Sequence, residues 1–282
     1  MEPIPTERAP RLAPLKGLRA VLFDVYGTLL LSGSGEVGTQ AGPNGAAMVE
    51  ALSEFGLRLR CSGDEAVALL FETIRAGHAR RRQAEGIKYP ELQIADVWRE
   101  TLDELARRGC IEPAPEPALD VARLAVEYEA RANPCWPMPG VEACLESLRA
   151  KGLLLGIVSN AQFYTPELFP ALLGREAETL GFDPALTFYS YRRGAAKPGM
   201  VLFTAAAEAL GARGIAPGEV LYVGNDLLND IRPAARQGFQ TALLAADARS
   251  LRLREDEPLC RGVEPDVVLT ALDQLDRCVM IA

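Results

Sequence analysis

The stretch VLFDVYGTLL, residues 21–30, decides how the rest of the chain is interpreted. Its apolar residues predict a short buried strand, and that strand delivers a single carboxylate, Asp24, into a turn formed by Gly27 and Thr28. Tyr26 occupies the position where a second carboxylate would give Asp24 an acid/base partner. The stretch therefore raises the question of which chemistry needs Asp24 and tolerates Tyr26.

Further along the chain, short apolar runs alternate with helical patterns. The runs predict strands, at residues 19–24, 153–158, 219–224, 240–245 and 266–269. The helical patterns lie between them, at residues 141–152, 198–211 and 229–238. Strands that alternate with helices predict a parallel sheet with both faces covered, so we expect an α/β fold.

Residues 34–133 differ from this alternating part because they hold helical patterns and almost no strand signal. One pattern opens with Ser62 and Glu65 at the spacing of a capping box, which marks a helix N-terminus. We interpret this region as a helical domain inserted after the first strand. The core domain would then comprise residues 1–33 and 134–282.

The bulk composition limits the classes of partner. A formal charge of −8 over 282 residues argues against a nucleic-acid backbone as partner. The longest apolar runs are too short to span a bilayer, and the proline-rich N-terminus lacks the apolar segment of a secretory signal. We therefore expect a cytoplasmic protein that binds neither nucleic acid nor membranes.

The cysteines and the single histidine nearly exclude several kinds of site. None of the six cysteines forms a CxxC pair, so free thiols in a reducing compartment are expected. His78 is the only histidine. Ser-His and Cys-His catalysis and Cys/His zinc sites need more imidazole or paired thiols.

Polar residues stand where several predicted strands end. They are Asp24, the pair Ser159 and Asn160, Lys197 in the segment RRGAAKPG that follows the run LTFYSY, and the segment GNDLLND at residues 224–230. Open parallel sheets place ligands at the carboxyl ends of their strands. If the strands are adjacent, all four segments converge on one crevice.

Together these residues suit chemistry on an anionic substrate. Asp24 can act as a nucleophile and form an acyl intermediate, while Ser159 can donate to a bound anion. Lys197 adds positive charge against developing negative charge and keeps Asp24 ionised. Asp226 and Asp24 supply the hard oxygen ligands that suit Mg²⁺, and the carbonyl of Tyr26 could supply another whatever its side chain.

Four motifs, DVYGT, SN, KP and GNDLLND, occur in this order. With them the chain resembles the haloacid-dehalogenase-like (HAD) hydrolase superfamily over about residues 19–33 and 140–245. The resemblance implies a Rossmann-like core and, for an insert at this place, a helical cap domain. It implies Asp24 as the nucleophile, Ser159 and Lys197 as anion-binding catalytic residues, and Asp226 as a ligand of Mg²⁺.

Further residues are assigned around this centre. Asp230 would support the metal ligands or pair with Lys197, and Asn229 belongs to the same supporting group. The residues expected at the substrate are Gly27, Thr28, Asn160 and Tyr26. In the insert, a run of three arginines is either a solvated helix face or a source of one substrate-binding side chain: Arg80, Arg81 and Arg82.

Two features point to different reactions within the superfamily. Its phosphatases usually carry a second aspartate where this chain has Tyr26, and an ordinary phenol, with a pKa of about 10, cannot easily replace it. Its dehalogenases carry a tyrosine there and use no metal. GNDLLND resembles instead the metal-using pattern, and three carboxylates in one crevice need a counterion beyond Lys197.

We therefore favour a Mg²⁺-dependent phosphohydrolase that acts on a small phosphorylated metabolite through an aspartyl-phosphate. A metal-independent 2-haloacid dehalogenase is the first alternative, because Tyr26 replaces the second aspartate. A catalytically silent binding or regulatory module is the other, although the intact Asp24, Lys197 and Asp226 argue against it.

Overall fold

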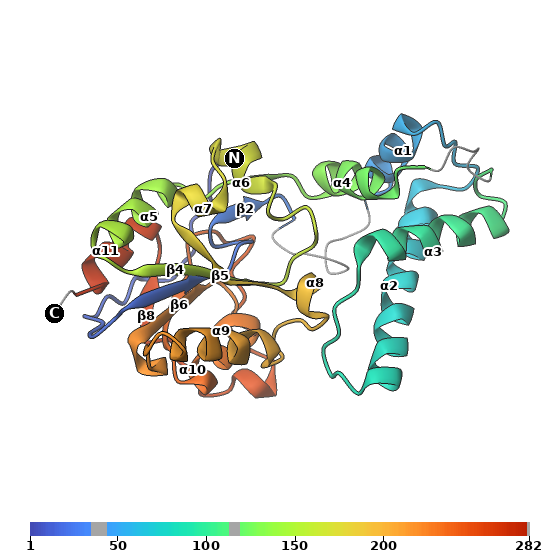
Figure 1. Ribbon diagram of the computed structural model, residues 1–282. Coiled ribbons are helices and arrows are strands. Elements are labelled where there is room, and N and C mark those ends of the chain that lie inside the picture. Colours follow the sequence, from blue (N-terminus) through green and yellow to red (C-terminus); the bar gives the residue numbers. More distant parts are fainter. Residues whose placement is uncertain (35–43, 113–118, 281–282) are drawn as a thin grey trace. The chain divides into compact units, whose positions relative to one another are not determined.

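The computed structural model describes residues 1–34, 44–112 and 119–280 (Figure 1). The chain divides into two compact units. A core unit comprises Met1–Gly35 and Trp136–Ala282, and a helical unit comprises Glu36–Cys135. The predicted insert, residues 34–133, includes residues 35–43 and 113–118, which lie outside the described part of the chain.

A six-stranded parallel sheet forms the centre of the core unit, in the order β5-β4-β1-β6-β7-β8. Its strands are β1 (Ala20–Phe23), β4 (Leu154–Ser159), β5 (Phe182–Tyr189), β6 (Val220–Gly224), β7 (Gln240–Leu244) and β8 (Val267–Leu269). The predicted parallel sheet is confirmed. Strand β1 lies between β4 and β6, so the stretch that carries Asp24 is central.

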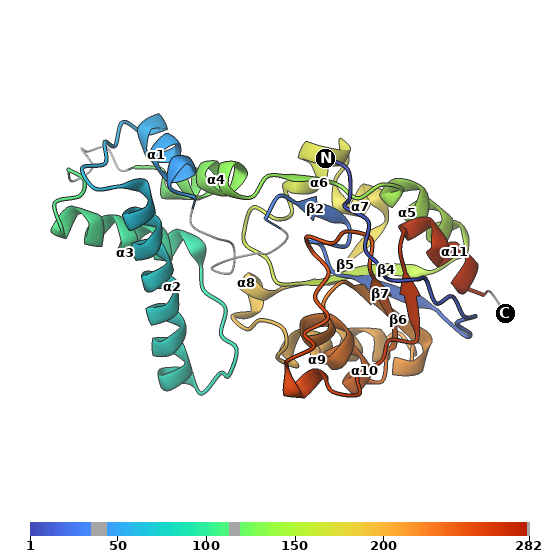
Figure 2. The same ribbon diagram turned by 180° about the vertical axis from the view of Figure 1, so that it is seen from behind.

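Helices cover both faces of this sheet, as Figures 1 and 2 show. Helices α5 (Val141–Ala150) and α11 (Leu275–Cys278) lie on one face, and α9 (Val201–Gly211) and α10 (Arg232–Gln237) lie on the other. The shorter helices are α6 (Leu168–Leu173), α7 (Ala177–Leu180) and α8 (Ser190–Arg193), with a π-helix at Leu227–Ile231 and 3₁₀ turns at Pro217–Glu219, Pro258–Cys260 and Leu272–Gln274.

The core is built by alternation along the strands, since successive side chains point to opposite faces. Leu22 packs with Phe203 of α9 and Tyr222 of β6 in one buried cluster. Phe23, its neighbour in sequence, instead contacts Phe182 edge to face, with ring centroids 6.2 Å apart. Every residue of β1 is buried, which agrees with a strand covered on both sides.

A second, two-stranded sheet joins β2 (Leu30–Ser32) to β3 (Cys135–Pro137). The amide of Met138 donates to the carbonyl of Leu29 at 2.9 Å, next to this pairing. The chain therefore leaves and re-enters the core unit through adjacent strands.

The helical unit contains α1 (Gly45–Glu54), α2 (Gly63–Glu85), α3 (Ile94–Arg107) and α4 (Val121–Ala132). The predicted capping box is confirmed at the start of α2. The amide of Glu65 donates to Ser62 Oγ at 3.2 Å, and the amide of Ser62 donates to the Glu65 carboxylate at 2.8 Å. Trp98 of α3 packs edge to face on Tyr128 of α4, with centroids 5.3 Å apart.

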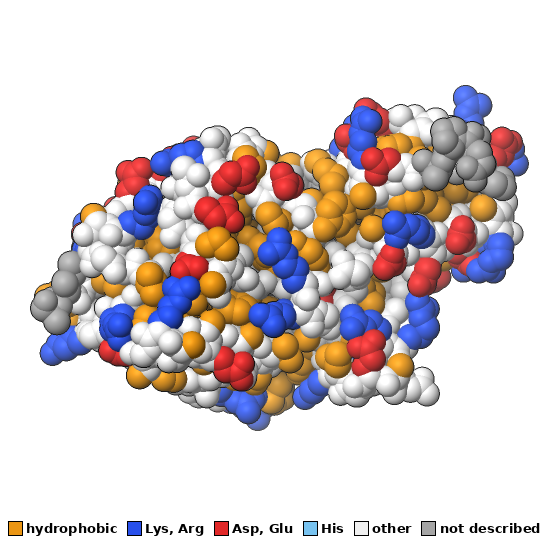
Figure 3. All heavy atoms as spheres, in the orientation of Figure 1, with side chains coloured by type: hydrophobic (Ala, Val, Ile, Leu, Met, Phe, Trp, Pro, Cys, Tyr) orange, Lys and Arg blue, Asp and Glu red, His pale blue; other side chains and the backbone are white. Residues whose placement is uncertain are grey.

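On the face seen in Figure 3, basic and acidic side chains are interspersed. Exposed ion pairs such as Arg8–Glu255 and Arg80–Glu100 contribute little to stability. Among the described residues, none of the helices combines the length and the apolar character needed to cross a bilayer.

Candidate active site

The segments singled out in the sequence meet at the carboxyl edge of the sheet. Asp24 directly follows β1, Ser159 is the last residue of β4, and Asp226 follows β6. These three strands are adjacent. Lys197, which follows β5 and α8, joins them through its side chain.

The ammonium of Lys197 links several residues of the site. It donates to Asp24 Oδ1 at 2.8 Å and to Asp230 Oδ1 at 2.6 Å. The carbonyl of Val158 at 3.3 Å and the hydroxyl of Tyr222 at 3.1 Å complete its surroundings. Burial alone would lower the pKa of Lys197, but the charges of the two carboxylates raise it above its ordinary value, so the ammonium stays protonated.

Asp230 connects Lys197 to the backbone of the loop after β6. Its Oδ2 accepts hydrogen bonds at 3.0 Å from the amides of Asn225 and Asp226, while its Oδ1 accepts from Lys197. Burial, together with the charges of Asp24 and Asp226, raises the pKa of Asp230 to about 7, against the lowering effect of Lys197. Asp230 pairs with Lys197, which is one of the two roles expected for it.

Tyr222 belongs to the same network, although the sequence did not reveal it. Its hydroxyl lies 2.8 Å from the carbonyl of Val158 and 3.0 Å from Asp230 Oδ1. Burial and the charges of Asp230 and Asp24 raise its pKa well above the ordinary value, so the phenol stays neutral and can donate one hydrogen bond. Tyr222 therefore helps to hold the Lys197–Asp230 pair in place.

The side chains of Ser159 and Asn160 form hydrogen bonds with backbone groups in this structure. The Asn160 side chain accepts from the Lys197 amide at 2.7 Å and donates to the Lys197 carbonyl at 3.2 Å. It thus fixes the segment from which Lys197 projects. The hydroxyl of Ser159, which is fully buried, donates to the Asn160 carbonyl at 3.1 Å.

Gly27 and Thr28 lock the turn after Asp24 against the loop after β6. Gly27 has a φ of +79°, and a Cβ placed on it would lie 2.5 Å from the Asn225 amide nitrogen. Thr28 Oγ1 donates to Asn225 Oδ1 at 3.2 Å, and Asn225 Nδ2 donates to the carbonyl of Ser250 at 2.6 Å. Only glycine suits that conformation and that close approach.

The phenol of Tyr26 is held by a neighbouring loop. Its oxygen lies 2.9 Å from Thr165 Oγ1, and both side chains are buried. Thr165 Oγ1 also accepts from the amide of Gln162 at 3.1 Å. Tyr26 therefore ties the turn after β1 to the loop after β4.

Asp226 is surrounded by donors. Its Oδ1 accepts from the amides of Leu228 at 2.8 Å and Asn229 at 3.2 Å, and its Oδ2 accepts from Asn229 Nδ2 at 2.9 Å. Arg254 completes the set, with Nη2 2.7 Å from Asp226 Oδ2 and Nε 3.3 Å from both oxygens. Asn229 thus supports Asp226, and Arg254 is a cation that the sequence did not place here.

The residues expected to bind Mg²⁺ offer carboxylate and carbonyl oxygens, which are the ligand types that this ion prefers. A carboxylate has about four acceptor positions, however, and the donors around Asp226 fill them. The sequence argument for a metal ion was that the three carboxylates need a counterion beyond Lys197. Arg254 supplies such a counterion. In the described ranges, no three His, Cys, Asp or Glu side chains are grouped so as to hold a metal ion.

Two of the three arginines of α2 form ion pairs with acidic residues of the helical unit. Arg80 pairs with Glu100 at 2.6 Å, and Arg81 pairs with Glu85 at 2.7 Å. These contacts favour a solvated helix face for both of them.

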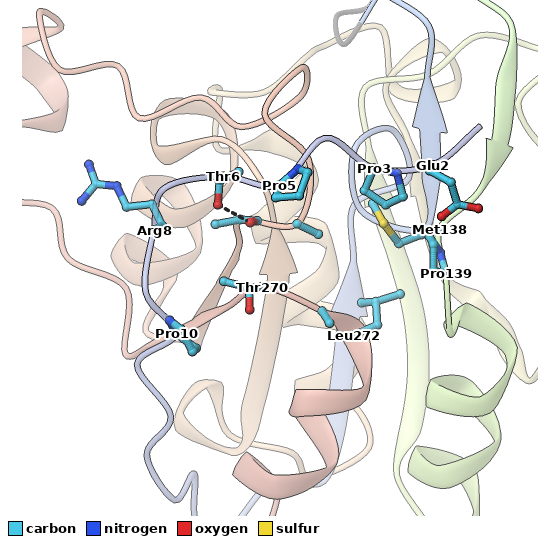
Figure 4. Close-up of a pocket in the computed structure, with 13 residues that line it drawn as sticks. Glu2, Pro3, Pro5, Thr6, Arg8, Pro10, Met138, Pro139, Thr270 and Leu272 are labelled. Carbon is cyan, nitrogen blue, oxygen red and sulfur yellow. Dashed lines mark hydrogen bonds between the residues drawn. The ribbon is translucent and has the colours of Figure 1, made fainter.

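A cavity of about 490 Å³ lies elsewhere in the core unit, under the N-terminal segment (Figure 4). Thr6 Oγ1 donates to the carbonyl of Ala245 at 2.7 Å there, and Met138 and Leu272 line the other side. None of the site residues described above lines it. Its lining is largely proline and aliphatic, so we place the candidate chemistry at Asp24 and not in this cavity.

A family model for haloacid dehalogenase-like hydrolases matches residues 18–238. The chain belongs to this family. The predicted membership is confirmed, and the HAD protein described here is a hydrolase.

Individual relatives include both phosphatases and dehalogenases. The glyceraldehyde 3-phosphate phosphatase of Methanopyrus kandleri is 29% identical over 224 residues, which are 79% of this chain and 82% of that protein. The 2-haloacid dehalogenase of Pseudomonas syringae superposes with a TM-score of 0.57 at 20% identity, covering 93% of this chain and 97% of that one.

The HAD-hydrolase YfnB of Bacillus subtilis, solved bound to magnesium, gives a TM-score of 0.52 at 20% identity, with 94% and 99% covered. At these identities the solved structures show the fold alone. The predicted fold class, a HAD-like core with a Rossmann-like parallel sheet, is confirmed.

Proposed function

We propose that this HAD hydrolase is a phosphohydrolase that acts on a small phosphorylated metabolite, with Asp24 as its nucleophile. The observation that carries the proposal is the contact of Asp24 Oδ1 with the ammonium of Lys197, which is itself fixed by Asp230 and Asn160. Identity of 29% to a glyceraldehyde 3-phosphate phosphatase supports a phosphorylated substrate.

In the proposed reaction Lys197 holds one oxygen of Asp24 and thereby orients the other toward the substrate phosphorus. A bond forms between Asp24 and phosphorus as the bond to the leaving oxygen breaks, and the leaving oxygen takes a proton from water or from the substrate itself. Water then attacks the phosphorus of the aspartyl-phosphate, which releases phosphate and returns Asp24 as a carboxylate.

Lys197, Ser159 and the backbone amides after Asp24 are proposed to bind the phosphoryl oxygens. Mg²⁺, when bound, would be held by Asp24, the carbonyl of Tyr26 and Asp226, and would neutralise phosphoryl charge. We propose that the helical unit serves as the cap that selects substrates, as the family resemblance implies.

A metal-independent 2-haloacid dehalogenase remains the second candidate, and two observations favour it. Tyr26 replaces an acidic residue, and Arg254 already neutralises Asp226 without a metal. The same Asp24 would then displace halide from carbon and form an ester.

Phosphate release from an aryl phosphate tests the proposal, measured with Mg²⁺ and with excess chelator. The Asp24→Asn variant is the control, because it keeps the size of the side chain and removes the nucleophile. We expect release that needs both Mg²⁺ and Asp24. Chloride release from a 2-chloroacid that persists in chelator, with no phosphate release, would establish the dehalogenase instead.

A further inference from the structure

Arg254 stands where a cation is needed at Asp226. Its guanidinium contacts both carboxylate oxygens, at 2.7 Å from Nη2 and at 3.3 Å from Nε. The Asp226 side chain is 8% exposed and that of Arg254 is 23% exposed. The pair is therefore less screened by solvent and salt than the exposed ion pairs of the surface.

Backbone hydrogen bonds hold the segment of Arg254 beside Asp226. The amide of Arg252 donates to the Asn225 carbonyl at 3.0 Å, and the amide of Leu227 donates to the Arg252 carbonyl at 2.9 Å. These two bonds join the segment of Arg254 to the loop that carries Asp226. Arg254 also has a φ of +52°, a conformation that is unfavourable for an arginine and persists only where the surroundings impose it.

We propose that Arg254 is an internal cation that competes with a divalent metal ion for Asp226, and so sets the metal affinity of the site. This inference rests on the proposed function, which takes Asp226 as a ligand of Mg²⁺. Of the donors to Asp226, the amides of Leu228 and Asn229 are fixed by the turn. The two side-chain donors are Asn229 Nδ2, from the same turn, and the guanidinium of Arg254, which is the charged one and comes from a separate segment on a long side chain.

The competition follows from charge and from acceptor capacity. Mg²⁺ must take a lone pair of an Asp226 oxygen, and the guanidinium holds that position. A metal ion and Arg254 at the same carboxylate would also repel each other. Metal binding therefore has to move Arg254 away, which weakens the apparent affinity by the free energy of the Arg254–Asp226 contact.

Titration calorimetry with MgCl₂ and MnCl₂ on the full chain tests this directly. The variant is Arg254→Asn, because asparagine tolerates a positive φ and carries no charge. Arg254→Gly, which also suits that backbone, serves as the second variant. The matched control is Arg8→Ala, which removes one positive charge from an exposed pair with Glu255, next to Arg254 in sequence.

We expect both Arg254 variants to bind Mg²⁺ and Mn²⁺ about tenfold more tightly than the unaltered chain, the order of effect of one charge at contact distance. Arg8→Ala should leave the affinity unchanged. Adding Asp226→Asn to Arg254→Asn should remove the gain, because the competition needs the carboxylate.

Equal metal affinity with and without Arg254, no binding of metal to any of these proteins, or a gain that survives Asp226→Asn would each overturn the inference. Its failure is distinguishable from failure of the proposed function. Phosphate release that depends on Asp24 would still stand if the calorimetry shows no effect of Arg254.

Discussion

The phenol oxygen of Tyr26 lies 2.9 Å from Thr165 Oγ1, inside the core unit, and this contact gives Tyr26 a structural role. The same residue distinguishes this chain from HAD phosphatases that carry a second aspartate. A tyrosine engaged in this way joins two loops of the site. It does not need to act as a proton donor to be useful there.

The first prediction concerns that contact. Tyr26→Phe should keep phosphate release within a few fold and should lower the free energy of unfolding by about 1 kcal/mol, the usual effect of one buried hydrogen bond. Initial rates and urea denaturation measure the two quantities. A large loss of kcat at unchanged stability would instead place the phenol on the substrate.

Lys197 should be needed for both folding and activity. Lys197→Met leaves Asp24 and Asp230 facing each other without a counterion, so we expect a loss of about 3–5 kcal/mol in unfolding free energy. Activity should fall by about 10²- to 10³-fold or more, because a donor to the reacting charge is lost.

A double variant separates these two effects. Adding Asp230→Asn to Lys197→Met removes one of the opposed carboxylates, and it should restore part of the stability and none of the activity. Denaturation midpoints of the single and double variants give the comparison. A single variant as stable as the unaltered chain would show that the buried pair is not the anchor of the site.

Tyr222 should act as a positioning residue. Tyr222→Phe removes the hydroxyl that lies between Val158 and Asp230, and it should cost about 1–2 kcal/mol of stability. Because Lys197 then loses a neighbour, kcat should fall more than KM changes. Tyr128→Phe, which removes a hydroxyl in the helical unit, is the control and should leave kcat unaltered.

Gly27 should tolerate no side chain, and the chain offers a matched comparison. Gly27 and Gly17 both have a positive φ, of +79° and +69°. A Cβ on Gly17 would meet nothing within 4 Å, whereas one on Gly27 would collide with Asn225 and Ser250.

Gly17→Ala therefore measures the backbone strain alone, about 1–2 kcal/mol. Gly27→Ala should cost about 1–3 kcal/mol more, because the turn has to move away from Asn225, and it should also reduce activity. Thermal or urea unfolding of both variants checks the difference. Equal costs would mean that the close approach to Asn225 is unimportant.

The sheet and the meeting of Asp24 with Lys197 could be predicted from the sequence because their signals are local. Strands β1, β4 and β6 are apolar runs, and Asp24, Ser159 and Asp226 stand at or just after their ends. Strand β5 is more polar, and Lys197 follows it only after α8. Once the strands are parallel and adjacent, their carboxyl ends coincide. The pairing of Lys197 with Asp230 follows from the same geometry.

The site residues that the sequence analysis did not identify depend on contacts between segments that are far apart in the sequence. Arg254 lies in LREDEP, a segment without periodicity, and only the folded chain brings it to Asp226. Tyr222 stands inside an apolar strand, where a tyrosine is equally typical of core packing. Thr165 gave no signal because a threonine in a loop has many ordinary roles.

The most direct test of the account is to trap the covalent intermediate on Asp24. Borohydride reduces an acyl phosphate, so a chain quenched during turnover of an aryl phosphate should carry homoserine at position 24. Peptide mass spectrometry should find this change only after exposure to substrate, and not in Asp24→Asn. Rapid phosphate release with residue 24 unreduced, or with the modification at another carboxylate, would contradict the claim that Asp24 is the nucleophile.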